Sequence, residues 1–111
     1  MPIRLWQNIY SLFIERGDKD MSEREVKQIR VSGKTSVAQL AGSVVKSIED
    51  GFSLEIRAVG ASAVNQMYKA CAVARGTLAT RGRDLLIKPG FSDINEDGLE
   101  KTVMVANIVI Q

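Results

Sequence analysis

The pattern of apolar and polar positions predicts two amphipathic helices. In the first, over residues 36–50, apolar residues recur three and four positions apart, which places them on one helix face. They are Val37, Leu40, Ala41, Val44, Val45 and Ile48. Ser36 and Gln39 match a capping box at the start of this helix, and Gly51 suits the left-handed residue that follows a helix end.

The second helical pattern follows Gly60, which permits a tight reversal of the chain. Ser62 is the predicted N-cap, and the apolar stripe again has spacings of three and four. The stripe consists of Val64, Met67, Cys71, Ala74 and Leu78. Residues 59–76 are therefore predicted to form a strand end, a turn and a helix.

Strand patterns flank these helices, because apolar residues alternate or run continuously in four stretches. The stretches are 28–32, 52–58, 84–88 and 100–110. Asn95, Asp97 and Gly98 supply a turn in a hairpin arm at 91–99.

The resulting order, βαβαββ, predicts an α+β fold: a two-layer sandwich in which a four-stranded mixed sheet carries two helices on one face. The last predicted strand, 100–110, is apolar on both faces. We therefore expect it to be central in the sheet or covered by another subunit, with the open sheet face or the hairpin taking part in self-association.

Residues 1–27 are predicted to be an extension of a domain at 28–110. Apolar residues within 1–20 share one helical face, and one interpretation is an amphipathic helix that docks on the body or on a partner chain. The other interpretation takes Met21 as the natural start. It rests on residues 15–18, which can be encoded by a purine-rich sequence that resembles a bacterial ribosome-binding site.

Composition limits the classes of function. The 111 residues include no His and a single cysteine, Cys71, on the apolar stripe. An intrachain disulfide, a Cys/His zinc site and a Cys-His dyad are therefore excluded, and we expect a non-enzymatic protein with no metal or cofactor. We expect a cytoplasmic location, and the sequence lacks the run of about 20 apolar residues that a membrane span needs.

The net charge of +2 is too small to indicate a nucleic-acid partner by itself, but the charges are unevenly distributed. Residues 21–90 hold eleven Lys and Arg against six Asp and Glu, whereas residues 91–100 hold four acids and no base. The hairpin arm is thus predicted to be acidic, and we expect polar and basic residues to gather at the opposite end of the fold.

Candidate binding residues surround the predicted start of the second helix. Asn65, Gln66 and Lys69 point away from its apolar stripe, beside backbone amides that carry about half a positive charge. Lys34 follows Gly33 in the turn after the first strand, where it could contact one phosphate of a polymer. The Gly-Lys-Thr sequence there lacks the earlier glycine of a P-loop, which excludes a nucleoside triphosphatase.

Each candidate also has a purely structural interpretation. The carboxamides of Asn65 and Gln66 can cap the preceding turn or pair with sheet backbone, and Lys34 can be an ordinary exposed lysine. Three arginines near the end of the second helix suit the negative end of its dipole as well as they suit phosphates. They are Arg75, Arg81 and Arg83.

Five blocks of sequence, in the same order along the chain, resemble one family. They are residues 60–66, 69–70, 72–76, 89–94 and 97–102. Together they resemble the stage V sporulation protein S family over about residues 28 to 110. The resemblance implies an Alba-like fold and a bacterial cytoplasmic protein that affects sporulation or cell development. It also implies nucleic-acid binding.

Alba proteins themselves are similar more distantly, through a Gly-Lys pair that looks like Gly33-Lys34. Their hairpin arm is basic, whereas this arm is acidic and would be repelled by phosphates. A family arginine before the glycine of the second helix corresponds to Val59. The residues expected to contact nucleic acid are therefore Lys34, Asn65, Gln66, Lys69, Arg75, Arg81 and Arg83.

We therefore expect a nucleic-acid-binding regulator of sporulation that forms a homodimer or a higher homo-oligomer, with the choice between DNA and RNA left open. One alternative is a protein-interaction adaptor whose acidic arm docks on a basic partner. Another is a small anionic ligand at the start of the second helix, oriented by Asn65 and Gln66.

Overall fold

The computed structural model describes residues 24–111 and has the predicted order of elements, βαβαββ. The elements are β1 (Val26–Val31), α2 (Val37–Glu49), β2 (Ser53–Ala58), α3 (Ala61–Ala79), β3 (Leu85–Glu96) and β4 (Leu99–Ile110). Both interpretations of residues 1–20 lie outside the described residues.

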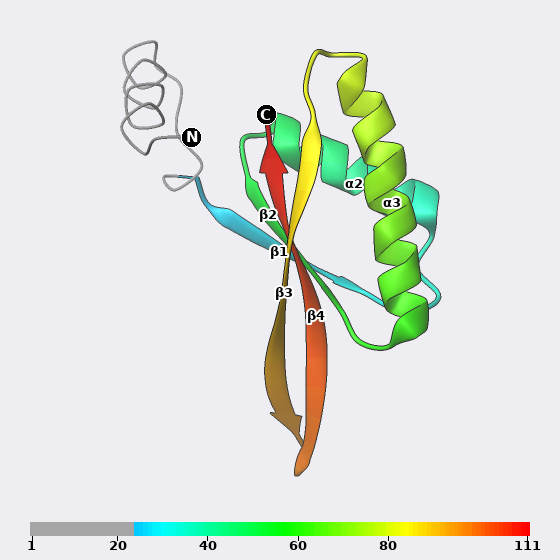
Figure 1. The fold of residues 1–111 in the computed structure, drawn as a ribbon, viewed down its shortest axis with the longest axis vertical. Coiled ribbons are helices and arrows are strands. Elements are labelled where there is room, and N and C mark those ends of the chain that lie inside the picture. The colour runs from blue at the N-terminus through cyan, green and yellow to red at the C-terminus, as the bar shows by residue number, and fades with distance from the viewer. Residues whose placement is uncertain (1–23) are drawn as a thin grey trace.

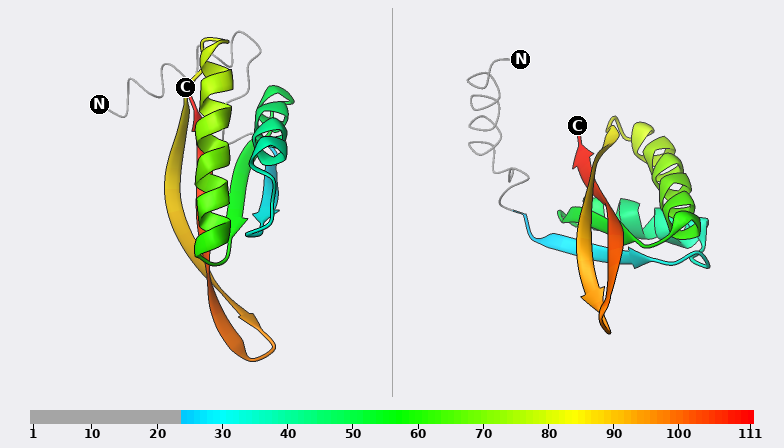
Figure 2. Two further views of the ribbon diagram at one scale, coloured as in Figure 1. Left: turned by 90° about the vertical axis from the view of Figure 1, so that its right-hand side faces the viewer. Right: turned by 60° about the horizontal axis from the view of Figure 1, so that its bottom comes forward.

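The four strands form one mixed sheet in the order β1-β2-β4-β3. β1 pairs with β2 in parallel, and β4 pairs antiparallel with both β2 and β3. The helices α2 and α3 lie together on one face of this sheet (Figures 1 and 2). The predicted two-layer α+β sandwich is confirmed, and so is the central position of the last strand.

Both predicted apolar stripes face the sheet and form its core. In α2, Ser36 is confirmed as the N-cap because its hydroxyl accepts a hydrogen bond from the Gln39 backbone N–H at 3.3 Å. The buried residues of α2 include Leu40, Ala41, Val44, Val45 and Ile48, and those of α3 include Met67, Ala70, Cys71, Ala74 and Leu78. They pack on buried residues of the central strands, such as Ile56, because burial of apolar surface is the main favourable term in folding.

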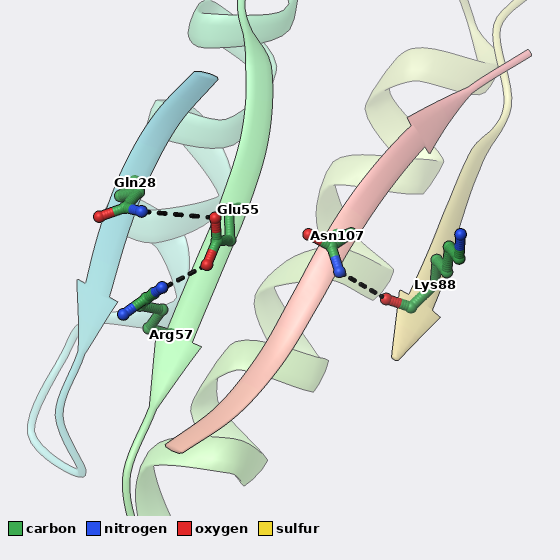
Figure 3. A network of polar contacts seen from close by, with 5 residues as sticks. All are labelled: Gln28, Glu55, Arg57, Lys88 and Asn107. Carbon is green, nitrogen blue, oxygen red and sulfur yellow. Dashed lines mark hydrogen bonds and ion pairs between the residues drawn. The ribbon is translucent and has the colours of Figure 1, made fainter. Parts of the chain in front are cut away.

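The opposite face of the sheet carries polar groups (Figure 3). On β2, Glu55 and Arg57 alternate with the buried residues and form an ion pair with Nε and Oε1 2.8 Å apart. Gln28 donates to the same carboxylate, and the Asn107 amide donates to the Lys88 carbonyl. This part of the open face is therefore adapted to solvent.

The β3–β4 hairpin is longer than the sequence predicts. β3 continues through Pro89 and Gly90, because it is an edge strand and an edge tolerates a residue without an N–H. Asp97 and Gly98 both have positive φ, 52° and 78°, as a two-residue type I′ turn requires. The resulting arm projects from the body (Figure 1).

The acidic arm and the loops after β1 and β2 lie at the same end of the sheet, where β1, β2 and β3 terminate (Figure 1). The pairing directions require this, because β1, β2 and β3 all run the same way. The expectation that the arm lies at the opposite end from Lys34, Asn65, Gln66 and Lys69 is therefore wrong. The physical reason is that α3 returns the chain to the end of the sheet where β2 begins, so β3 runs in the same direction as β2.

Candidate nucleic-acid interface

Lys34 lies at the tip of a short loop between β1 and α2 that is held by its own hydrogen bonds. The Ser32 N–H donates to the Thr35 hydroxyl at 2.9 Å, and the Thr35 N–H donates back to the Ser32 carbonyl at 3.1 Å. The Lys34 N–H donates to the Ser32 hydroxyl at 3.2 Å. The loop is thus internally bonded, while Lys34 itself is exposed.

Two contacts fix this loop against the start of α3. A Cβ atom added at Gly33 would lie 2.8 Å from the Ser62 Cβ, so only glycine fits without a shift of the backbone. The Gln66 amide donates to the Thr35 carbonyl at 2.8 Å. Lys34 is therefore held beside the first turn of α3.

The first turn of α3 has no side-chain cap. Its N-cap is Gly60, with φ 90°, and the first turn contains no acidic residue. The predicted N-cap role of Ser62 is wrong, because Ser62 lies inside the first turn, with its Cβ against Gly33. The first N–H groups of this turn have no partner within the helix and carry the positive end of the helix dipole.

The structure places four of the seven predicted residues in or beside the first half of α3. Asn65 and Lys69 are exposed and lie one turn apart on α3, and Lys34 is held next to that turn by the loop. Gln66 is half-buried, and its amide nitrogen is occupied by the Thr35 carbonyl. Gln66 thus positions the loop, through loop backbone rather than sheet backbone.

The three predicted arginines lie in the second half of α3 and just after its end. Arg75 Nε is 2.8 Å from an Asp84 carboxylate oxygen, and Arg81 forms an ion pair with Glu49 of α2. The hydrogen bond from Arg75 lowers the pKa of the Asp84 carboxyl below its ordinary value. At about 1.5 Å per helical residue, Arg75 lies about 9 Å along α3 from Lys69, and Arg81 and Arg83 lie beyond the helix end, so the arginines are further from the Lys34 loop than Lys69 is.

Two parts of this arrangement are not predicted from the sequence. One is the packing role of Gly33, although a glycine between a strand and a capping box is typical of a close approach by another segment. The other is Gly60 as the N-cap, because Ser62 is the more favoured residue type for that position. Both parts depend on α3 meeting the β1–α2 loop in space.

Two observations on the described residues concern groups that catalysis often uses. Within residues 24–111, no three His, Cys, Asp or Glu side chains are grouped so that they could hold a metal ion. Burial raises the pKa of the Cys71 thiol to about 11, so this cysteine is a neutral core side chain at pH 7. No helix in the same range is long and apolar enough to cross a membrane.

A family model described as Stage V sporulation protein S (SpoVS) matches residues 27–111. The chain belongs to this family. Membership in the SpoVS family connects the chain with sporulation, and it confirms the resemblance drawn from the five sequence blocks.

A solved structure, Alba from Thermoplasma volcanium, is similar to this chain with a TM-score of 0.53 and 15% sequence identity. The match covers 77% of this chain and 99% of that chain. At this level of identity the likeness shows the fold, and it confirms the Alba-like architecture.

Proposed function

We propose that this member of the SpoVS family is a non-enzymatic, cytoplasmic nucleic-acid-binding regulator of sporulation. The observation that carries the proposal is the placement of Lys34, which two contacts hold beside the uncapped first turn of α3. A helix start that presents free amides next to a lysine suits a phosphate group.

The remaining residues of the cluster suit a polymer rather than a single ion. Lys69 lies about one turn further along α3 than Asn65, so a backbone that contacts Lys34 and the helix start can reach it with a second phosphate. Asn65 can donate to a phosphate or bond to a base edge. Arg75, Arg81 and Arg83 are proposed as a second contact for a strand long enough to extend along α3.

The acidic arm limits how the polymer approaches. It projects from the same end of the sheet as the Lys34 loop, and its exposed acids include Asp93, Asp97 and Glu100. Phosphates are repelled by these charges at low salt. We infer that the nucleic acid lies along the helix side of the body and avoids the arm, which differs from clamping by a basic arm.

We also propose that the protein forms a homodimer. The described residues expose several large apolar side chains beside or on the hairpin, including Tyr68, Leu86, Phe91 and Met104. Exposed apolar side chains on neighbouring elements are typical of an interaction surface.

The test of nucleic-acid binding is a salt titration with single-stranded and duplex DNA and RNA. The double variant Lys34→Ala/Lys69→Ala should reduce the slope of log K against log salt by about 1.4 for single strands or about 1.8 for duplex, as the loss of two phosphate contacts requires. The control variant Lys46→Ala/Lys88→Ala removes the same charge from other surfaces and should change the slope much less. Equal slopes for the two variants would contradict the site.

The second candidate function is a protein-interaction adaptor. The observation that favours it is the arm itself, which combines exposed acids with two exposed apolar side chains, Phe91 and Leu99. If none of the four nucleic acids binds at low salt, the adaptor is the better explanation, with a basic and partly apolar partner docking on the arm.

A further inference from the structure

Two arginines are neighbours on the open face of the sheet, the face away from the helices. Arg30 of β1 and Arg57 of β2 are register partners, and neighbouring strands lie about 4.8 Å apart. Arg57 alternates along β2 with the buried Ile56 and Ala58, so its side chain lies on the open face (Figure 3). Arg30 lies on the same face, because register partners on adjacent strands point the same way.

The positive charges of this pair exceed the negative charge beside them. Glu55 Oε1 is 2.8 Å from Arg57 Nε, and the other carboxylate oxygen accepts from the Gln28 amide at 3.4 Å. Arg30 is exposed and forms no ion pair with any other residue of the range 24–111. The two guanidinium groups therefore share one carboxylate, and that carboxylate is already bonded on both oxygens.

The register between β1 and β2 does not optimise the stability of this surface. Like charges on neighbouring strands repel each other, whereas opposite charges attract. Arg30 faces Arg57, while the neutral Gln28 faces Glu55. A phosphate between the two arginines would relieve their repulsion, because each guanidinium presents a planar fork of N–H donors that matches phosphate oxygens.

The arginine pair lies near the Lys34 loop, which consists of residues 32–35. Lys34 follows Arg30 by four positions, and a chain spans at most about 3.6 Å per residue, so their Cα atoms are no more than about 14 Å apart. The loop joins β1 of the sheet layer to α2 of the helix layer (Figure 1). Lys34 is thus at the rim of the fold, between the open face and the start of α3.

We propose that a single strand of nucleic acid passes from the start of α3 over the Lys34 loop onto the open face of the sheet, where Arg30 and Arg57 bind its phosphates. The inference rests on the proposed nucleic-acid binding and adds the class of ligand, a single strand. A duplex has a persistence length of about 150 base pairs and does not turn around the rim of one small domain. A single strand bends at each nucleotide and can follow both faces.

The position of β1 in the sheet also suits this path. β1 is the edge strand opposite β3, so β2 and β4 separate it from β3 of the acidic arm. The strand therefore turns onto the open face at the edge away from β3, where repulsion by the arm is weaker. Unpaired bases on the open face can stack on the planes of the arginine side chains, which a base inside a duplex cannot do.

The test compares a thirty-nucleotide single strand with the same strand annealed to its complement, by fluorescence anisotropy over a range of salt. Arg30→Gln should reduce the slope of log K against log salt by about 0.7 for the single strand, and Arg30→Gln/Arg57→Gln by about 1.4, as the loss of one and two phosphate contacts requires. The slope for the duplex should not change. Lys46→Gln removes the same charge from an exposed position of α2 and should leave both slopes unchanged.

The single variant keeps the test independent of folding, because Arg30 has no ion-pair partner among the described residues, whereas loss of Arg57 also removes the partner of Glu55. Equal losses on the single strand and the duplex overturn the path around the rim. If Arg30→Gln changes neither slope while Lys34→Ala/Lys69→Ala still lowers them, the open face binds no nucleic acid and an acidic protein segment is the better ligand for it. The proposed function then stands. Absence of binding to any nucleic acid at low salt overturns the proposed function and this inference together.

Discussion

Gly33 holds Lys34 in position because its missing side chain leaves room for the first turn of α3. The neighbouring Ser62 Cβ is fixed by its helix, so the space for a Cβ at Gly33 cannot be gained by rotating a side chain. The Gln66 amide then bonds the loop to the same helix. The charged residue of the site is thus placed by two neutral neighbours.

We expect Gly33→Ala to destabilise the protein by about 1–3 kcal/mol, because the added methyl group forces the loop away from α3. The matched control is Gly42→Ala, where the added Cβ meets nothing within 4 Å and should stabilise α2 by about 0.5–1 kcal/mol. Urea unfolding followed by circular dichroism measures both free energies. A Gly33→Ala protein as stable as the wild type would contradict the close contact.

The raised pKa of Cys71, about 11, gives a second expectation for a single residue. Burial favours the neutral thiol, so its contribution to stability is complete below the unfolded pKa of 9.0 and is lost as pH rises through about 11. At pH 8, alkylation by iodoacetamide should be about a hundredfold slower than in urea, because two pKa units reduce the thiolate fraction by that factor. Mass spectrometry follows the reaction, and equal rates in both states would contradict burial of the thiol.

The sequence predicts the elements well because each has its own local signal. The helical stripe of α2, with Ser36 as its cap, and the Asp97-Gly98 turn are confirmed in the structure. The relation between elements is predicted wrongly, because the arm lies at the same end of the sheet as Lys34. The order strand, helix, strand already indicates that β2 and β3 run the same way, so the sequence carries a signal for this placement.

The negative charges of the acidic arm should weaken nucleic-acid binding at the Lys34 loop, because the arm and the loop lie at the same end of the sheet. We expect Asp93→Asn/Glu100→Gln to tighten binding several-fold in 50 mM salt and to have little effect at 500 mM, where the Debye length is only a few ångströms. Fluorescence anisotropy with a labelled oligonucleotide measures this. The control Glu25→Gln/Asp50→Asn, at the opposite end of the sheet, should have a smaller effect at low salt. An equal effect would show that binding responds only to the net charge of the protein and not to the position of the arm.

Considered as a whole, the molecule has two separate basic regions joined by α3. Lys34 and Lys69 lie near its start, whereas Arg75 and Arg81 lie toward its end and have carboxylate partners. A short ligand at the helix start cannot reach the far region. The two regions act together only on a strand long enough to follow the helix.

We therefore expect Arg83→Gln to leave the affinity for a six-nucleotide strand unchanged and to weaken binding of a thirty-nucleotide strand. Lys34→Ala should weaken both, because it removes a contact at the helix start. Titrations of each variant with both strands give the comparison. An equal loss of affinity for the two strand lengths in Arg83→Gln would show that the two basic regions do not bind one strand that follows α3.

The central position of β4 has a consequence for synthesis of the protein. β4 is the only link between the β1–β2 pair and β3 among the described strands, yet it is the last of them to be made. Until residues 99–110 have left the ribosome, the nascent chain cannot complete its sheet, and apolar residues such as Ile56 lack their final partners. The growing polypeptide therefore folds late, and translation that stops before this strand leaves a product for chaperones and proteases rather than a smaller folded domain.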